Sequence, residues 1–510
     1  MEKMRRIKNR KKMRWSIITF LVLLSCTAYF LFQLYAFPLI PGRWKLITAD
    51  IVCIIVLLCG FISILRGRRT SRKIVISTVN VFLSLVLLAV SFFLPRTTAD
   101  IRNTFDALPE TVSTRVNVYA LTTEYKAAHT DIFRNRGIYT SLNLADYSNR
   151  QFITQTSVDQ DNQNDLVMQL CDLYGVDHVW QNSKESIWEA LDALYHADGD
   201  ALILNEAYIS AIEDTELYAD FRQDTVVLHT FTKEVPVEQP TEPENLSDTF
   251  SVFIAGSDSR EEKLSSVTRT DVDIVATVDP DKKVIMLVSF PRDSFIPNPA
   301  MGGGYDKLTH MGIYGMDNSM LALENILAVP VRNYVLVNFR TYSKVVNTMG
   351  GITINNPYSF NIDSYSFPAG EISLDGDAAL AFVRARYSLP NGDFGRNEHQ
   401  IMVLKALIRK ALSMESLVNY QNLLEALSGT FLTNMDVDGI FDLIAEQLGT
   451  PGTWEIISYH ITGSTGSDVC ASMPGMYLSV VYPYDYQLQF VSEQIMKMYR
   501  NEDVVQEAMP

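Results

Sequence analysis

The sequence predicts an α/β protein carried on three N-terminal transmembrane helices. Three apolar stretches near the N-terminus are each close to the ~20 residues that a helix needs to cross a bilayer. The rest of the chain alternates strand-like runs rich in Val and Ile with amphipathic helical runs. We therefore expect a small α/β domain first, followed by a larger domain in which helices cover a sheet.

The predicted membrane spans are Trp15–Tyr35, Leu46–Leu65 and Ile74–Leu94. Basic residues gather on one side of them, because Met1–Arg14 holds eight Lys or Arg and the connector Arg66–Lys73 holds five. The positive-inside rule places these two segments in the cytoplasm and everything after the third span outside the cell. We expect a multi-pass membrane protein with extracytoplasmic C-terminal domains.

Charge divides the chain at the same place. Residues 1–96 hold 16 basic and 2 acidic residues, a net charge of +14, so the remainder carries −30 of the total of −16. An external region this acidic is a poor candidate for nucleic-acid binding, and we expect no nucleic-acid partner. Its arginines are concentrated near a few motifs, where the local potential can be positive.

The predicted organisation has four parts: 1–96 is the cytoplasmic N-terminus with the membrane anchor, 97–231 a small extracytoplasmic domain, 232–248 a linker, and 249–510 the larger domain. The linker is indicated by Thr232–Ser247, which holds four Glu and three Pro without an apolar period. No catalytic constellation is expected in the small domain.

Apolar spacing predicts the individual elements. In the small domain, strands are expected at Val116–Tyr119, Ala201–Leu204 and Thr225–Leu228, and helices at Asp165–Tyr174 and Ser186–Tyr195. In the larger domain, strands are expected at Phe250–Ala255, Val272–Val278, Lys283–Phe290 and Asn333–Phe339. Helices are expected there at Met316–Leu327, Thr341–Met349, Asp375–Phe382, Phe394–Leu412 and Asp485–Tyr499.

Acids and arginines stand at the ends of the short strands in the larger domain. Asp258 lies in a loop after Gly256, which we expect to let the backbone approach a ligand closely. Asp258 and Asp271, if brought together, repel each other, and a divalent cation held through their oxygens resolves the repulsion. Guanidinium groups such as those of Arg269 and Arg292 grip phosphate oxygens. Each Asp-Arg pair alone could be a surface salt bridge, but several in one domain favour a diphosphate site with its cation.

Further cations follow along the chain. Arg384 and Arg386 project to one face if the chain is extended, the arrangement we favour, and diverge by roughly 200° if it is helical. Arg396 and Gln400 are i, i+4 neighbours at the start of a helix, where an arginine is unfavourable unless an anion binds. Lys307, in a glycine-rich loop, is either another cation of the site or a mobile surface lysine.

These motifs resemble those of the LytR–CpsA–Psr family, whose members are anchored outside bacterial membranes. The resemblance covers roughly residues 249–415, and the three spans with an intervening domain are similar to its capsule-type members. The motifs that carry it are Gly256–Arg260, Arg269-Thr270-Asp271, Ser289–Asp293, Tyr305–His310, Gly350-Gly351, Leu374-Asp375-Gly376 with Ala379-Leu380, Arg384-Ala385-Arg386, and Gly392-Asp393 with Arg396 and Gln400.

The resemblance implies an α/β/α domain with a central mixed sheet that binds a polyprenyl (pyro)phosphate lipid with magnesium. It implies transfer of a glycopolymer, such as capsular polysaccharide or teichoic acid, from a polyprenyl-pyrophosphate donor to peptidoglycan through a phosphodiester link. A receptor without chemistry and a pyrophosphate-lipid hydrolase are the alternatives.

Carried over position by position, the resemblance also implies roles for individual residues. Asp258 and Asp271 fall on the magnesium acids. Apart from the resemblance, an acceptor hydroxyl needs a base, and Asp271 or Asp293, beside Arg292, could be one. Many family members have Arg-Gln where this chain has His399-Gln400, so His399 is either a replacement contact or a bystander. The positions that fall on the pyrophosphate contacts are Arg269, Arg292, Lys307, Arg384, Arg386, Arg396 and Gln400.

Overall fold

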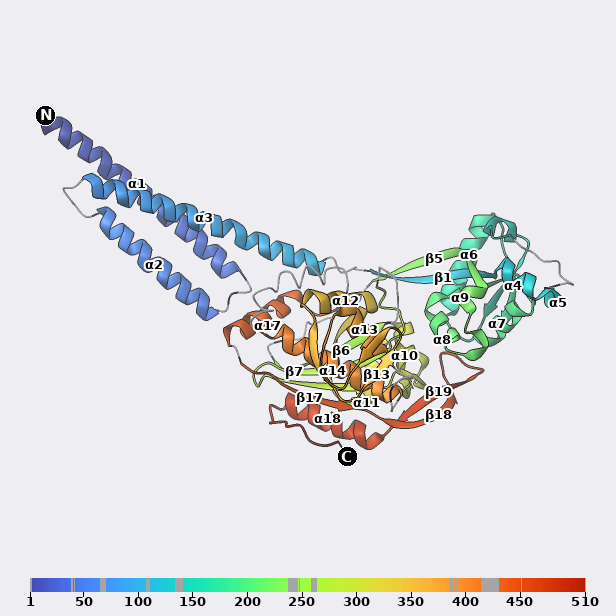
Figure 1. Ribbon diagram of the computed structural model, residues 1–510. Helices are drawn as coiled ribbons and strands as arrows, with labels where there is room; N and C mark the ends of the chain where they lie inside the picture. Colours follow the sequence, from blue (N-terminus) through green and yellow to red (C-terminus); the bar gives the residue numbers. More distant parts are fainter. Residues whose placement is uncertain are drawn as a thin grey trace.

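The chain folds into a helical membrane segment and two α/β units (Figure 1). We call residues 111–236 the small unit and residues 250–509 the large unit. The computed structural model describes residues 2–37, 40, 42–64, 70–106, 111–133, 141–236, 246, 248–257, 264–385, 389, 392–413, 431–450 and 452–509. The predicted domain boundaries stay a prediction.

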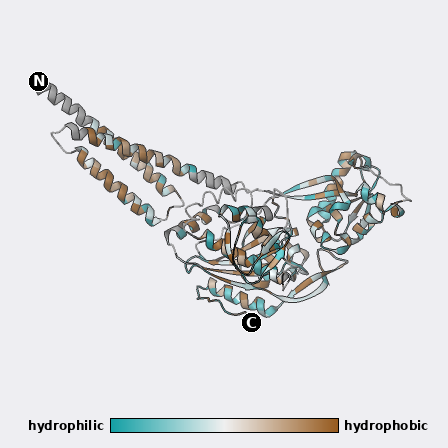
Figure 2. Cartoon of the chain, in the orientation of Figure 1, coloured by the Kyte–Doolittle hydropathy of each residue, from teal (hydrophilic) through white to brown (hydrophobic). Residues whose placement is uncertain are grey.

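The membrane segment consists of α1 (Glu2–Ala36), α2 (Gly42–Ile64) and α3 (Thr70–Asp106). Stretches long and apolar enough to cross a membrane occupy residues 15–36, 42–63 and 74–96, which agrees with the three predicted spans. They form the brown helices that project from the two units in Figure 2. Phe37, after α1, packs against Phe431 and Phe441 of the large unit, so this unit lies at one end of the helices.

The small unit has a five-stranded mixed sheet in the order β3-β2-β4-β1-β5. Its strands are β1 (Thr111–Leu121), β2 (Gln151–Gln155), β3 (Trp180–Lys184), β4 (Ala201–Asn205) and β5 (Thr225–Pro236). Its helices are α4 (Thr123–Ala128), α5 (Thr130–Phe133), η1 (Leu144–Tyr147), α6 (Gln160–Tyr174), α7 (Ile187–Tyr195), η2 (Glu206–Tyr208), α8 (Ile209–Glu213), η3 (Glu216–Tyr218) and α9 (Phe221–Asp224). The sequence predicted neither β2 nor β3, and β3 is a polar edge strand that buries none of its residues fully.

The large unit is built on a six-stranded mixed sheet in the order β16-β11-β6-β7-β8-β17. The strands are β6 (Phe250–Ser257), β7 (Val272–Asp279), β8 (Val284–Phe290), β11 (Asn333–Asn338), β16 (Phe431–Thr433) and β17 (Glu455–His460). Neighbouring strands β6, β7 and β8 are antiparallel, whereas β6 pairs in parallel with β11 and β8 with β17.

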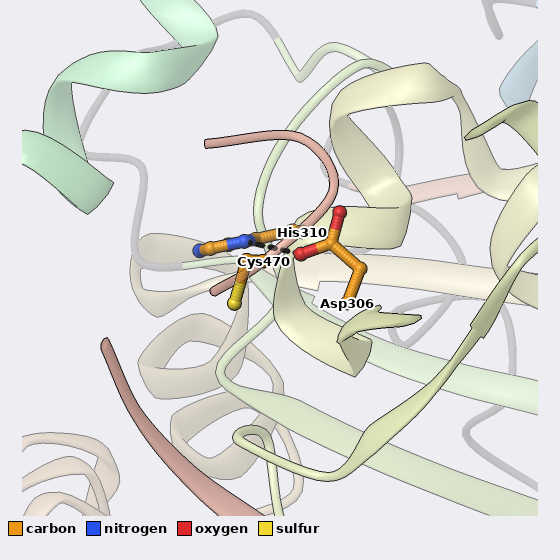
Figure 3. Close-up of side chains that lie close together, drawn as sticks. All are labelled: Asp306, His310 and Cys470. Carbon is orange, nitrogen blue, oxygen red and sulfur yellow. Dashed lines mark hydrogen bonds and ion pairs between the residues drawn. The ribbon is translucent and has the colours of Figure 1, made fainter. Parts of the chain in front are cut away.

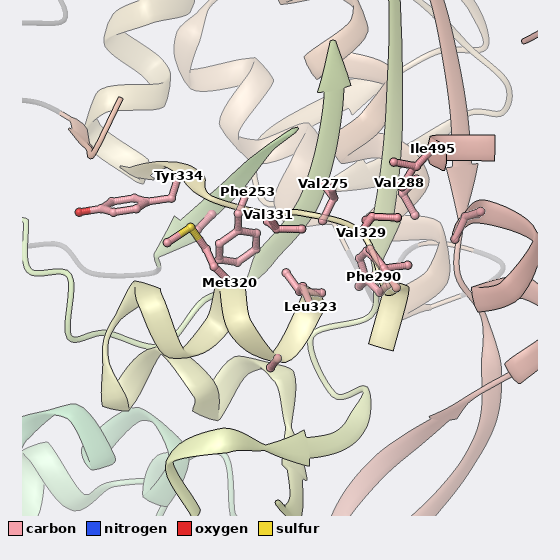
Figure 4. Packing of buried hydrophobic residues seen from close by; sticks show 14 of the residues in the cluster. Phe253, Val275, Val288, Phe290, Met320, Leu323, Val329, Val331, Tyr334 and Ile495 are labelled. Atoms are coloured by element: carbon pink, nitrogen blue, oxygen red, sulfur yellow. The ribbon is translucent and has the colours of Figure 1, made fainter. Parts of the chain in front are cut away.

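Helices cover both faces of this sheet. Val275 of β7 faces α11 (Met316–Leu327) and α18 (Asp485–Tyr499), in the core shown in Figure 4. The adjacent Ile274 packs with Ile401 of α14 (Asp393–Ala411) on the opposite face. Successive residues of a strand point to opposite faces, so a strand apolar on both sides needs two helical layers. The predicted α/β/α architecture with a mixed sheet is confirmed.

The remaining elements surround this sandwich. They are β9 (Phe295–Asn298), η4 (Pro299–Met301), β10 (Gly304–Lys307), α10 (Leu308–Met311), η5 (Gly312–Tyr314), α12 (Phe339–Thr348), β12 (Ile352–Asn356), β13 (Phe360–Ile362), β14 (Tyr365–Phe367), β15 (Gly370–Leu374), α13 (Gly376–Arg384), α17 (Val437–Gly449), β18 (Gly463–Val469) and β19 (Tyr477–Pro483).

The two units share an apolar core. Trp188 and Ile212 of the small unit belong to the same buried cluster as Met473 and Leu478 of the large unit. The indole Nε1 of Trp188 also donates a hydrogen bond to the Met473 carbonyl at 3.3 Å. In Figure 1 the β18–β19 hairpin reaches toward the small unit. This packing fixes the small unit against the large one.

Candidate functional site

The site lies at one edge of the large sheet, where β6 and β8 end and β7 begins. Asp271 directly precedes β7, and its backbone N–H donates to the Gly256 carbonyl at 2.7 Å. Arg292 and Asp293 follow β8. The register pairs Gly256 with Val272 and Asp273 with Phe290, so residues distant in sequence meet at this edge.

Gly256 packs closely against the neighbouring strand, and its predicted close approach to a ligand stays a prediction. A Cβ atom there would lie 2.8 Å from the Val272 side chain. The close approach that requires glycine is therefore to the neighbouring strand, where any larger residue would push β6 and β7 apart. In the structure this glycine sets the strand spacing that positions Asp271.

An ion-pair network links the acids and cations at this edge. Arg292 Nη1 lies 2.7 Å from Asp271 Oδ1, and Lys307 Nζ lies 3.1 Å from Asp293 Oδ1. Burial opposes ionisation of both acids, but the pKa of Asp271 falls below its usual range because Arg292 and Arg269 prevail. The pKa of Asp293 is lowered in the same way, mainly by Lys307. Both carboxylates are ionised at neutral pH.

Lys307 is buried rather than a mobile surface residue. Its side chain is only 10% exposed, and it belongs to β10, which pairs with β9. Its ion pair with Asp293 places it in the same network as Arg292, whose Nε lies 3.8 Å from Asp293 Oδ2.

Arg269 is the most deeply buried cation of the site, with 5% of its side chain exposed. Its Nε donates to Thr309 Oγ1 at 3.3 Å, and its Nη2 lies 2.6 Å from Asp214 Oδ2 of the small unit. Its Nη1 is buried without a hydrogen-bond partner among the residues that the structure describes. A buried guanidinium N–H of this kind is suited to an anionic ligand.

A cleft of about 760 Å³ opens between the two units beside these residues. The large unit lines it with Arg269, Asp271, Arg384, Arg396 and Gln400. Arg396 and Gln400 lie in the first turns of α14, as the sequence predicted, where the helix dipole also favours an anion. The cleft therefore collects five of the predicted site residues from three separate segments.

Two predicted residues, Asp258 and Arg386, lie outside the described residues. Arg384 is the last residue of α13, and its C-cap Ala385 has φ −56° and ψ 128°, so the helix does not continue past Arg384. Because Arg386 is not described, the shared direction of Arg384 and Arg386 stays a prediction. Asp375 caps the N-terminus of α13, as expected for an acid at this position. The helix ends at Arg384, two residues beyond the end that the apolar pattern predicted.

His399 is a bystander to the cleft and belongs to an aromatic cluster. It is fully buried, stacks on Phe382 at 4.0 Å between ring centroids, and its Nδ1 lies 3.1 Å from the Phe382 carbonyl oxygen. Burial lowers its pKa to about 4, so the ring is neutral at physiological pH. A neutral imidazole held by ring stacking does not replace the arginine found in many family members.

Asp306, His310 and Cys470 form a second buried cluster (Figure 3). His310 Nδ1 lies 2.8 Å from Asp306 Oδ1, which also accepts from the Lys307 backbone N–H. The other oxygen, Oδ2, accepts from Asn298 and from the Ser472 backbone. Burial raises the pKa of the Cys470 thiol to about 12. Since protein donors already fill the carboxylate, the cluster is a hydrogen-bonded junction that anchors the Lys307 backbone.

Two acids near the site were not assigned to it from sequence. Asp273, two residues after Asp271, is 1% exposed, and burial raises its pKa to about 8. Asp214 was missed, because it lies in the small unit, 55 residues before Arg269, and no local motif marks it. Only the packing of the two units brings it to the arginines.

Fold and site together define an α/β/α domain whose sheet edge presents arginines and a carboxylate to a cleft. The sequence profile of the LytR_cpsA_psr family matches residues 217–478. That segment is more than half of the 510 residues, and the chain belongs to this family.

Several characterised proteins are similar to this segment. The polyisoprenyl-teichoic acid–peptidoglycan teichoic acid transferase TagU of Enterococcus faecalis is 40% identical over 195 residues, which are 38% of this chain and 64% of that protein. The Bacillus subtilis protein of the same name is 35% identical over 227 residues, 44% and 72% of the two chains. The crystal structure of B. subtilis TagV is 28% identical with a TM-score of 0.42, covering 50% of this chain and 98% of that one. The similar segment thus spans less than two thirds of the E. faecalis relative.

Proposed function

We propose that this protein transfers a glycopolymer, such as teichoic acid or capsular polysaccharide, from a polyprenyl-pyrophosphate-linked donor to peptidoglycan. The observation that carries the proposal is the convergence of Arg269, Arg384 and Arg396 on one cleft beside the Asp271–Arg292 pair. Planar guanidinium groups match phosphate oxygens, and a pyrophosphate offers enough of them for several arginines. The activity in the names of the E. faecalis and B. subtilis relatives supports the same reaction.

The helix that begins at the arginine site also suits the lipid part of the donor. Arg396 and Gln400 stand at the start of α14, and Leu404 and Ile408 follow further along it, partly buried against the sheet. Along α14, polar groups are therefore followed by apolar ones, and a ligand with a charged head and a long apolar chain matches this order. Polyprenyl pyrophosphate is such a ligand.

In the proposed reaction, an acceptor hydroxyl oxygen of peptidoglycan attacks the phosphorus atom joined to the glycopolymer. A new phosphodiester bond forms, the bond from that phosphorus to the bridging oxygen breaks, and polyprenyl phosphate leaves. Arg269 and Arg292 stabilise the charge on the phosphates, which is the main demand of phosphoryl transfer. Asp271 and Asp293 are the two candidates to receive the hydroxyl proton. Asp271 lines the cleft and is paired with Arg292, whereas Asp293 is paired with Lys307.

Magnesium is the cation that this donor set fits. It is commonly held by one or two carboxylates together with substrate phosphates. The contact of Asp271 with Arg292 uses Oδ1, and within the described part of the chain its second carboxylate oxygen is left for a metal at the cleft. Asp258, outside the described residues, would be the second acid. When bound, the ion would neutralise charge on the pyrophosphate.

The membrane helices support the proposal, because a site anchored at the membrane would be close to a lipid-linked donor. The predicted orientation puts the units outside the cell, where peptidoglycan is, and the contact of Phe37 with the large unit holds that unit against the end of the helices.

Incubation of the full-length protein with lipid-linked donor and peptidoglycan, with and without magnesium, tests the proposal. Polymer linked to peptidoglycan only with magnesium is the expected product. Free polymer would instead identify a hydrolase. Retention of the donor without either product would identify a receptor.

A further inference from the structure

We propose that Asp214 of the small unit occupies the phosphate position of the arginine site and must be displaced when the donor binds. The inference rests on the proposed function, since it treats the arginines as the pyrophosphate site. It adds a residue from outside the matched family segment, which begins at residue 217. Asp214 would thereby set the affinity of the site for the donor.

The position of the Asp214 carboxylate carries the proposal. A single oxygen, Oδ2, lies 2.6 Å from Arg269 Nη2 and 3.6 Å from Arg292 Nη2. One anionic oxygen between two guanidinium groups is the arrangement that a phosphate oxygen takes in an arginine site. Arg269 is 5% exposed and, among the described residues, is paired with no other carboxylate, so Asp214 supplies its negative charge in the absence of ligand. Arg292, 11% exposed, is paired with Asp271 as well.

The local fold holds Asp214 at this place. It is the C-terminal cap of α8, and its backbone N–H donates to the Ser210 carbonyl at 3.1 Å. Ile209 and Ile212 of α8 are buried in the core shared by the two units. The helix therefore cannot withdraw without disturbing that core.

The side chain itself can move, because 43% of it is exposed. A change of rotamer would free both arginines without any motion of the small unit. Asp214 thus acts as a gate, by which we mean a side chain that must leave the arginines before the donor binds. The free-energy cost of displacing it is that of breaking its ion pairs, which are partly exposed to solvent.

The small unit also provides a wall for the cleft. Glu213, the residue before Asp214, lines the cleft but bonds to Arg222 of its own unit. Glu216, two residues after Asp214, is exposed and is absent from the described lining of the cleft. These two acids supply matched controls for a change of charge at Asp214.

The test compares the full-length wild type with Asp214→Asn, Glu213→Gln and Glu216→Gln in detergent. The probe is farnesyl pyrophosphate, titrated by calorimetry in a buffer without divalent cations. Asp214→Asn keeps the size of the side chain and removes its charge, so we expect roughly fivefold tighter binding, the upper range for a partly exposed ion pair. Glu213→Gln should change the affinity for farnesyl pyrophosphate less than Asp214→Asn does. Glu216→Gln should bind it with wild-type affinity.

Thermal unfolding supplies a second readout. Without ligand, Asp214→Asn should unfold at a lower temperature than wild type, because the buried Arg269 loses its ion pair and Arg292 loses one of its three. Saturating farnesyl pyrophosphate should remove most of this difference. A purely structural role would lower stability without tightening the binding of the probe.

The outcomes separate the two proposals. The gate is overturned if Asp214→Asn binds the probe with wild-type affinity or more weakly, or if Glu213→Gln gains as much affinity as Asp214→Asn. Each of these results leaves the arginine site intact. If neither wild type nor Asp214→Asn binds the probe, or if Arg269→Ala binds it as wild type does, the pyrophosphate site itself is wrong and the gate falls with it.

Discussion

Replacement of Arg292 by alanine perturbs the centre of the proposed site. Arg292 has one short contact, 2.7 Å to Asp271, and longer ones of 3.6 Å to Asp214 and 3.8 Å to Asp293. If it makes one charge-assisted contact to the donor, its loss costs about 1.5–3 kcal/mol. This corresponds to roughly ten- to a hundredfold weaker binding.

The same change affects the fold, because Arg292 is 11% exposed and its removal leaves Asp271 without its ion pair. Breaking a buried pair in this way costs about 3–5 kcal/mol of stability. Arg292→Lys keeps the charge but loses the planar fork, so it should recover stability more than affinity. Arg500→Ala, at an exposed pair with Glu502 far along the chain, is the control for losing an arginine.

The assay is calorimetric titration of farnesyl pyrophosphate into each full-length variant, at a temperature where circular dichroism shows the protein folded. We expect Arg292→Ala to bind at least tenfold more weakly than Arg500→Ala. If folded Arg292→Ala binds with wild-type affinity, Arg292 makes no contact with the phosphates and its place in the site is refuted.

Three further predictions concern the proposed metal ligand Asp271, the buried acid Asp273 and the orientation of the membrane helices. Asp271→Asn should reduce transfer steeply but donor retention only modestly, because the proposed metal would act mainly in the transition state; wild-type transfer at low magnesium would remove Asp271 from the metal site. Burial raises the pKa of Asp273 to about 8. Between about pH 4 and 8 the unfolded chain releases this proton while the folded chain keeps it, so stability falls as pH rises, and Asp273→Asn should flatten that decline in urea unfolding. Parallel declines in both proteins would contradict this. Protease added to intact protoplasts should digest the chain after Leu94 and spare the connector Arg66–Lys73, and cleavage at the connector would overturn the orientation.

Much of the large unit follows from local patterns. Val275 and Ile274 face opposite helical layers because their strand is apolar on both sides, which is readable in the sequence. Arg396 and Gln400 share a helix face for the same local reason, and both line the cleft.

Other features depend on tertiary contacts that no local pattern reports. The need for glycine at position 256 arises from Val272 on the neighbouring strand. His399 is taken into an aromatic cluster with Phe382, and Lys307 is buried by its pair with Asp293. Asp214 reaches Arg269 only because an apolar core joins the two units.

In the proposed function, the arginine-lined cleft carries out the transfer of a pyrophosphate-linked polymer. The most direct measurement combines full-length protein, radiolabelled lipid-linked donor, peptidoglycan and magnesium, followed by muramidase digestion and mass spectrometry of the labelled fragments. The wild type should yield muropeptides joined to the polymer by a phosphodiester, and Arg269→Ala, checked for folding, should yield at least tenfold less. Equal amounts from both proteins, or no linked muropeptide from the wild type, would contradict the account.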